Sequence, residues 1–126
     1  MSNRLIFHMC KRSDWQVAQQ DGFYQGSGDD LRDGFMHFST AEQLAESAAK
    51  HRAGITGLLL IAIDPDDLGE ALKWEPSRGD QLFPHLYGVL DVSKVASVEE
   101  LPLGEDGLHV FPGIIPPWRP AGVENP

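Results

Sequence analysis

The chain has 126 residues, with ten Lys and Arg against nineteen Asp and Glu and a formal net charge of −9. This length suits one domain with a single core, and the negative charge disfavours non-specific binding to the phosphates of nucleic acids. A hydrophobic content of 41% and a charged content of 23% are normal for a globular protein, which excludes a disordered or fibrous chain.

Cysteine content and segment length exclude further classes. Cys10 is the single cysteine, so the chain can form no internal disulfide and no cysteine-based zinc site. The longest apolar segment, residues 58–63, is too short to cross a bilayer, and the first residues lack the length and flanks of a signal peptide. We therefore expect a cytoplasmic protein without a membrane partner, and we favour a monomer.

The first third of the chain predicts a strand, a short helix and a loop. Residues 5–10 form an apolar run of strand length that contains His8, which we expect to face inward or into a cleft. Ser13 then begins a capping-box spacing for a helix, and Gly22 marks its end. Residues 25–34 are predicted to be a loop that contains one turn of helix.

The middle of the chain predicts a strand, a second helix and a buried strand. Residues 34–38 have the pattern of a short strand, and Ser39 immediately supplies a capping box. Apolar positions in the following helix recur at the spacing of one buried face, and Gly54 ends it. Residues 56–64 are a dense run of Leu and Ile, which predicts a strand buried on both faces.

The second half of the chain predicts mainly strands. The expected strands cover residues 71–75, 83–90, 92–101 and 108–111. Because helices come early and strands come late, the pattern favours an α+β fold over an alternating parallel one. We predict a single domain over residues 1–112 and a proline-rich C-terminal tail over residues 113–126, because five of the nine prolines lie between Pro112 and Pro126.

Three histidines are the strongest candidates for chemistry. His8, His37 and His85 all lie beside aromatic residues in strand-like segments. Bulky neighbours desolvate an imidazole and fix its orientation, so each ring could donate one well-aimed hydrogen bond or transfer a proton. Singly, each is equally compatible with a structural role, whereas the set of three favours a shared cleft. His51 and His109 are weaker candidates.

Other uses of these residues are also open. Three imidazoles can bind zinc with water in the fourth position, but the chain has no HxH or HExxH spacing, and we expect no metal. Ser39 is a weaker candidate for a nucleophile than for a helix cap. A helix N-terminus with hydroxyls at Ser39 and Thr40 can also receive a phosphate or ribose oxygen.

Among the acidic residues, Glu75 is the main candidate. It follows Trp74 in a strand-like segment, where alternation places one of the two side chains inward. The aspartates of residues 64–67 are better interpreted as a solvated turn. The glycines of residues 22–34 form neither a GxGxxG nor a Walker motif, so the sequence supports no Rossmann or P-loop site.

Several of these segments together resemble the bacterial family called domain of unknown function 952. The resemblance spans about residues 5–112 and is carried by LIFH, the helix with Trp15, DGFMHFST, LLLIAID, KWE and FPHLYG. The family is grouped by resemblance with the ADP-ribosyltransferase-like fold, in which a split, strongly bent pair of small antiparallel sheets holds NAD in a cleft. The resemblance therefore implies that fold, with two or three short helices near the N-terminal half.

The resemblance also implies a function. We expect a small nucleotide ligand, NAD or a related ADP-ribose compound, with NAD as a substrate for ADP-ribosyl transfer or for hydrolysis of its N-glycosidic bond. His8 is similar in placement to a first-strand residue that contacts a cofactor ribose. Ser39 and Thr40 match in kind the end of a later strand beside the nicotinamide ribose, and Tyr87 is expected to stack on the cofactor or hydrogen-bond to it.

The implied catalytic residues are less complete. His37 and His85 are expected to activate the acceptor or to support developing charge. Many transferases of this fold use a glutamate to stabilise the oxocarbenium-like transition state, and this chain has no clear counterpart of that glutamate motif. Glu75 is the remaining catalytic candidate. The alternative function is a non-catalytic ligand-binding or protein-interaction module on the same fold.

Overall fold

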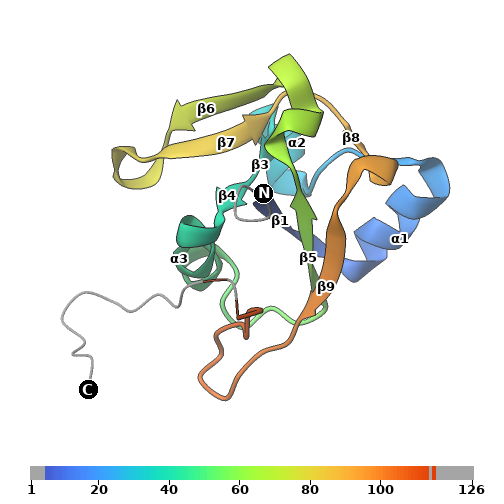
Figure 1. The fold of residues 1–126 in the computed structure, drawn as a ribbon. Coiled ribbons are helices and arrows are strands. Elements are labelled where there is room, and N and C mark those ends of the chain that lie inside the picture. Colours follow the sequence, from blue (N-terminus) through green and yellow to red (C-terminus); the bar gives the residue numbers. More distant parts are fainter. Residues whose placement is uncertain (1–4, 114, 116–126) are drawn as a thin grey trace.

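The structure, a computed structural model, describes residues 5–113 and 115 of the chain (Figure 1). The helices are α1 (Arg12–Asp21), α2 (Gly28–Asp33) and α3 (Ala41–His51), with 3-10 turns η2 (Pro65–Ala71), η3 (Arg78–Asp80) and η4 (Val92–Lys94). The strands are β1 (Ile6–Lys11), β2 (Phe23–Tyr24), β3 (Met36–His37), β4 (Ser39–Thr40), β5 (Leu58–Ile63), β6 (Leu72–Pro76), β7 (Leu82–Leu86), β8 (Leu90–Asp91) and β9 (Ser97–Leu101). Every strand pairing among them is antiparallel, which confirms the predicted α+β class.

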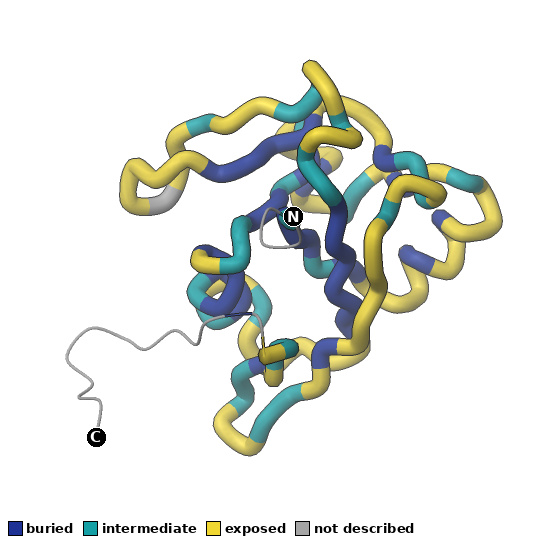
Figure 2. The backbone as a smooth tube through the Cα atoms, viewed as in Figure 1, coloured by how far each residue is buried: buried dark blue, intermediate teal, exposed yellow. Residues whose placement is uncertain are grey.

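The described strands form one larger sheet and two small ones. The larger sheet has the order β4-β1-β5-β9, and the small sheets have the orders β2-β8 and β3-β7-β6. All six residues of β5 are buried, as predicted, whereas β9 is exposed except at its last residue (Figure 2). Strand β5 is therefore the centre of the fold, and β9 covers its outer edge.

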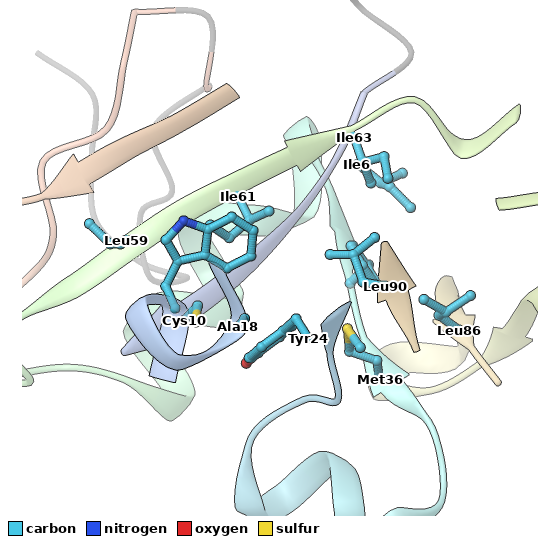
Figure 3. Close-up of a cluster of buried hydrophobic side chains, with 12 residues drawn as sticks. Ile6, Cys10, Ala18, Tyr24, Met36, Leu59, Ile61, Ile63, Leu86 and Leu90 are labelled. Atoms are coloured by element: carbon cyan, nitrogen blue, oxygen red, sulfur yellow. The ribbon is translucent and has the colours of Figure 1, made fainter. Parts of the chain in front are cut away.

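Alternation along β1 and β5 divides the core into two clusters. Ile6 and Cys10 of β1 and Ile61 of β5 pack with Trp15 and Ala18 of α1 in one cluster (Figure 3). The alternate residues of the same strands pack on the other face against Leu44 of α3. Because helices cover both faces, the hydrophobic run of β5 is continuous.

The helix termini differ in part from the predicted ones. Helix α1 begins at Arg12, its N-cap Lys11 makes no side-chain capping bond, and Ser13 lies inside the first turn, so the predicted capping box is wrong. Gly22 ends α1 with a φ of 87°, as predicted. The N-cap of α3 is Thr40, not Ser39, because the Thr40 hydroxyl is the one that accepts from the Gln43 N–H at the start of the helix.

The chain changes sheets between β3 and β4. His37 pairs with His85 of β7, whereas Ser39 pairs with Phe7 of β1, and the Phe38 N–H between them donates to the Pro84 carbonyl at 3.0 Å. Pro84 is tolerated inside β7 because proline lacks only the donor and keeps its carbonyl acceptor.

The predicted strand over residues 83–90 is divided in two. Strand β7 ends at Leu86, the Tyr87 N–H donates to the Ala71 carbonyl at 2.8 Å, and β8 then pairs with β2 instead of β6. Residues 108–111 form no strand, and their only bridge joins His109 to Leu103 among the described residues. Most of the predicted tail lies outside the described residues, and no helix in residues 5–113 is long and apolar enough to span a membrane.

Candidate functional site

A cleft of about 290 Å³ lies between β1, α2, the end of α3 and β7. His8, His37 and His85 all line it, together with Ser39, so the structure brings the three predicted histidines into one wall. Thr40, Glu75 and Tyr87 are not wall residues. They lie behind or beside it and hold other side chains.

Asp30 is the centre of the hydrogen bonding in this wall. Its side chain is only 3% exposed and accepts from the Ser27 N–H at 2.7 Å, the His37 N–H at 3.0 Å and His37 Nδ1 at 2.5 Å. Burial by itself acts to raise the pKa of Asp30, but the hydrogen bonds from His37 and Ser27 lower it to about 2. Asp30 is therefore a buried carboxylate that is fully ionised at neutral pH.

Glycine at position 26 gives Asp30 its room. Gly26 has a φ of 103°, and a Cβ added there would lie 2.7 Å from the Asp30 Cβ and 2.9 Å from its Oδ2. Both the backbone conformation and the close approach therefore require glycine. Ser27 and Asp30 form a reciprocal capping box that begins α2, which is longer than the predicted single turn.

His37 is held between two carboxylates. Nδ1 lies 2.5 Å from Asp30 Oδ1, and Nε2 lies 3.1 Å from Asp33 Oδ2. Because a carboxylate beside each ring nitrogen favours a proton on that nitrogen, this arrangement favours the cationic form of the ring. The hydrogen bond to Asp30 correspondingly raises the pKa of His37.

His8 is neutral and fully hydrogen-bonded. Its Nδ1 donates to the His37 carbonyl at 2.7 Å, so its Nε2 accepts from the Tyr24 hydroxyl at 2.9 Å. Burial lowers the pKa of His8 and outweighs the nearby Asp30 carboxylate, which acts to raise it. The His8 ring lines the cleft, while its two nitrogens tie β1 to β3 and β2.

His85 is supported by a different carboxylate. Its Nδ1 donates to Glu75 Oε1 at 2.8 Å across the β6–β7 pair, and the Tyr87 hydroxyl donates to the same oxygen at 2.7 Å. The hydrogen bond from His85, and then that from Tyr87, lowers the pKa of Glu75. Since Nδ1 is the donor to Glu75, Nε2 is the ring nitrogen at which a lone pair can lie. No interaction of Nε2 is found among the described residues.

The aromatic side chain of Phe35 contacts both His37 and His85. Phe35 stacks on His85 with ring centroids 4.1 Å apart and an interplanar angle of 28°, and it also contacts His37 at 4.7 Å and Tyr87 at 5.3 Å. The His37 and His85 rings meet edge to face at 5.6 Å. These contacts limit rotation of both imidazoles, so their orientations are set before a ligand enters.

The hydroxyl candidates have separate structural partners. Ser39 Oγ donates to Ser47 Oγ at 3.2 Å, and both serines line the cleft. The Thr40 hydroxyl accepts from the Gln43 N–H at 3.3 Å, and Gln43 in turn donates to the Leu82 carbonyl at 2.8 Å. Thr40 therefore has the capping role that the sequence assigned to Ser39.

The backbone of β1 also borders the cleft. The Arg12 N–H donates to Gly57 in line with β5, so hydrogen-bond alternation directs the backbone groups of Phe7 and Met9 toward the opposite side. Phe7 pairs there with Ser39 of β4, but β4 does not extend to Met9, which lines the cleft. The Met9 N–H and C=O are thus directed away from β5, on the side of β1 where β4 has ended.

Charged side chains surround the mouth of the cleft. Arg32 lies 3.1 Å from Asp29 and 3.3 Å from Asp33, and Arg52 lies 3.8 Å from Asp29. All four residues line the cleft together with His51, a weaker sequence candidate. The mouth therefore presents cations and carboxylates in alternation.

The remaining sequence candidates lie elsewhere or were missed. His109 donates from Nε2 to the Ile55 carbonyl at 2.8 Å and lines a separate hollow. Sequence reasoning missed Asp30 and Phe35, although the spacing from Ser27 to Asp30 is a capping-box signal. No group of three or more His, Cys, Asp or Glu side chains in residues 5–113 and 115 has an arrangement that would hold a metal ion.

Comparison with known proteins gives one family and one solved relative. The family model described as "Protein of unknown function (DUF952)" matches residues 9–98. The crystal structure of protein CC0527 from Caulobacter crescentus is similar, with a TM-score of 0.82, 45% identity, and coverage of 84% of this chain and 93% of that chain. Its solution NMR structure gives 0.76, 46%, 83% and 90%, respectively. No curated protein matches the chain.

Proposed function

The chain belongs to the DUF952 family, and from the residues of its cleft we propose that it binds NAD or a related ADP-ribose compound. In this proposal the fold is ADP-ribosyltransferase-like, and the split between the larger sheet and β3-β7-β6 supports it. His85, oriented by Glu75, activates water or another acceptor for attack on the N-glycosidic bond.

The observation that carries the proposal is the contrast between the two facing imidazoles. His37 has a carboxylate at each nitrogen, whereas His85 has a carboxylate only at Nδ1, which leaves its Nε2 available to a ligand. One ring is thus held by the protein at both nitrogens, and the other offers one nitrogen to accept a proton from a bound group. The pair lies 5.6 Å apart, which is short enough to act on one substrate.

The edge of β1 supports recognition of the nicotinamide half. A planar carboxamide has one donor and one acceptor side by side. Met9 lines the cleft and strand alternation directs its N–H and C=O away from β5, so we propose that this backbone pair meets the carboxamide. A volume of about 290 Å³ lies at the lower end of the range for ligand pockets, about 300 Å³ upward. We therefore propose that the nicotinamide and its ribose enter, while the diphosphate stays at the mouth.

The chemistry is a substitution at C1′ of that ribose. The oxygen of water forms a bond to C1′, the bond from C1′ to the pyridinium nitrogen breaks, and its electron pair returns to the ring as nicotinamide leaves neutral. The water proton passes to Nε2 of His85, whose imidazolium form is stabilised by Glu75 at 2.8 Å. With an acceptor hydroxyl in place of water, the same step transfers ADP-ribose.

Calorimetric titration with NAD, ADP-ribose and nicotinamide tests binding. We expect NAD and ADP-ribose to bind, and His85→Asn to lower nicotinamide release by about a hundredfold, because a general base contributes 10²–10⁴-fold. Leu82→Ala is the matched control, since Leu82 is an exposed residue of the same strand outside the cleft wall. Absence of binding to all three ligands at millimolar concentration would refute the proposal.

The second candidate is a binding module without catalysis. The observation that favours it is that one oxygen of Glu75 already accepts from both His85 and Tyr87, so it is less available to an oxocarbenium-like transition state. NAD binding without release of nicotinamide above the uncatalysed background would select this candidate.

A further inference from the structure

Asp33 occupies a position that its own helix disfavours. It is the last residue of α2, where the negative end of the helix dipole repels a carboxylate, and Asp29 lies one turn before it with the same charge. The partners of its carboxylate are side chains: His37 Nε2 at 3.1 Å and Arg32 Nε at 3.3 Å. Asp33 is thus placed by the cleft and not by the needs of α2.

His37 does not depend on Asp33 for its charge. Asp30 is 3% exposed and holds both the N–H and Nδ1 of His37, while the Asp33 side chain is 36% exposed at the mouth. An exposed ion pair contributes little and exchanges with solvent and ligands. Of the two carboxylates, Asp30 is therefore the permanent partner and Asp33 the replaceable one.

We propose that the Asp33 carboxylate occupies the position of an anionic oxygen of the ligand. A phosphate or diphosphate group then binds at Nε2 of His37 by displacing Asp33. The proposal rests on the proposed function for its assignment to the diphosphate of an ADP-ribose compound. Displacement releases Nε2 of His37 and Nε of Arg32, and Arg52 lines the same cleft. Asp29 keeps its contacts with the two arginines. Donors on His37 and Arg32 are the groups that form charge-assisted hydrogen bonds with phosphate oxygens.

The other groups around His37 set the background for a test. Asp29, Asp30 and Asp33 of α2 act on it, with His8 of β1 and His85 of β7, and Arg52 lines the same cleft. Only Asp33 combines direct contact with exposure. Removing it changes the ring's Nε2 partner and leaves the Asp30 contact in place.

The experiment uses inorganic pyrophosphate, titrated into the whole protein at constant ionic strength and followed by calorimetry and by the NMR resonances of the His37 ring. We expect Asp33→Ala to bind pyrophosphate roughly twofold to fivefold more tightly than the original chain, the range of an exposed ion pair. Asp33→Asn, which keeps the size of the side chain, should change affinity in the same direction. Glu99→Gln on the exposed face of β9 is the control for one lost charge, and it should leave affinity unchanged.

The proposal is overturned if Asp33→Ala and Asp33→Asn, both folded by circular dichroism, bind pyrophosphate no more tightly than the original chain. It is also overturned if pyrophosphate leaves the His37 resonances unmoved. Pyrophosphate has no glycosidic bond, so these results do not depend on turnover of NAD. A His37 response without nicotinamide release would keep the anion site and reject the glycosidic reaction.

Discussion

Replacement of Asp30 by asparagine gives the sharpest test of the charge arrangement. The side chains have the same shape, but asparagine offers one oxygen where Asp30 uses two. If that oxygen faces His37, the amide NH₂ faces the Ser27 N–H, and the capping interaction becomes a contact between donors. Asp30→Asn therefore removes the Asp30 half of the capping box and the charge opposite His37 in one step, while the Ser27 hydroxyl still accepts from the backbone N–H of residue 30.

The magnitude can be worked out in two ways. Loss of the hydrogen bond from the Ser27 N–H costs about 1 kcal/mol, and exchange of a charge-assisted hydrogen bond for a neutral one costs about 1–2 kcal/mol, which together give about 2–3 kcal/mol. Independently, lowering the pKa of Asp30 from 3.8 to about 2 corresponds to about 2–3 kcal/mol, because the side chain is buried and little screened. The two routes agree, and the loss is a large part of a typical folding free energy.

The effect should depend on pH in a defined way. The pKa of Asp30 is lowered, so its contribution is complete above 3.8 and is lost as the pH falls toward about 2. The pKa of His37 is raised, so its contribution is complete below 6.5 and is lost as the pH rises through the folded-state value. The difference between the two proteins should therefore be largest between about pH 4 and 6.5.

Urea denaturation across this range measures the free energy of unfolding of both proteins. Asp29→Asn is the matched control, because Asp29 lies on the same helix, is half exposed, and should change stability by less than about 1 kcal/mol. A loss for Asp30→Asn that is below about 0.5 kcal/mol at pH 5.5, or that stays constant up to pH 9, would refute the assignment of Asp30 as the partner of a protonated His37.

Three further substitutions test neighbouring contacts. Gly26→Ala should lower the free energy of unfolding by about 2–3 kcal/mol, because of strain at positive φ and the close approach to Asp30. Gly28→Ala, where an added Cβ has nothing within 4 Å, should be near neutral, and equal effects of the two substitutions in thermal melts would contradict this reasoning. Tyr24→Phe should cost about 1–3 kcal/mol above pH 6.5, where His8 contributes fully in its neutral form, and the cost should shrink as the pH falls through the lowered pKa of His8; a constant cost would speak against the neutral form. Glu75→Gln should slow nicotinamide release about 10- to 100-fold without weakening NAD binding, measured by product detection and calorimetry; an unchanged rate would exclude Glu75 as the group that orients His85.

The fold could be predicted where local pattern and tertiary structure agree. The dense apolar run of β5 needs burial on both faces wherever it lies, and the left-handed Gly22 ends α1 without help from other segments. The prediction of one strand over residues 83–90 was wrong because the division of this segment depends on its partners. The Tyr87 N–H donates to the Ala71 carbonyl, and β8 pairs with β2. Periodicity within one segment contains no information about which partner ends the pairing.

The candidate site divides along the same line. His8, His37 and His85 could be identified because a polar ring in an apolar strand is unusual. Their convergence follows from the pairing of β3 with β7 and from the hydrogen bond that joins His8 of β1 to His37 of β3. Asp30 could not be recognised in the same way, because acids in a glycine-rich segment usually face solvent. Only the capping box with Ser27 distinguishes it, and a capping box does not show that the acid also reaches His37.

The net charge of −9 and an anion site in the same chain are compatible because electrostatic effects are local. Charges farther apart than the Debye length, about 8 Å at physiological salt, are largely screened, so most exposed acids of this chain act only weakly on the cleft. The groups that matter are those in its wall, where Asp30 is neutralised by His37 and the exposed carboxylates of Asp29 and Asp33 are paired with arginines. The acidic surface should therefore slow the approach of an anionic ligand at low salt. The affinity of the cleft for that ligand depends instead on displacement of the Asp33 carboxylate.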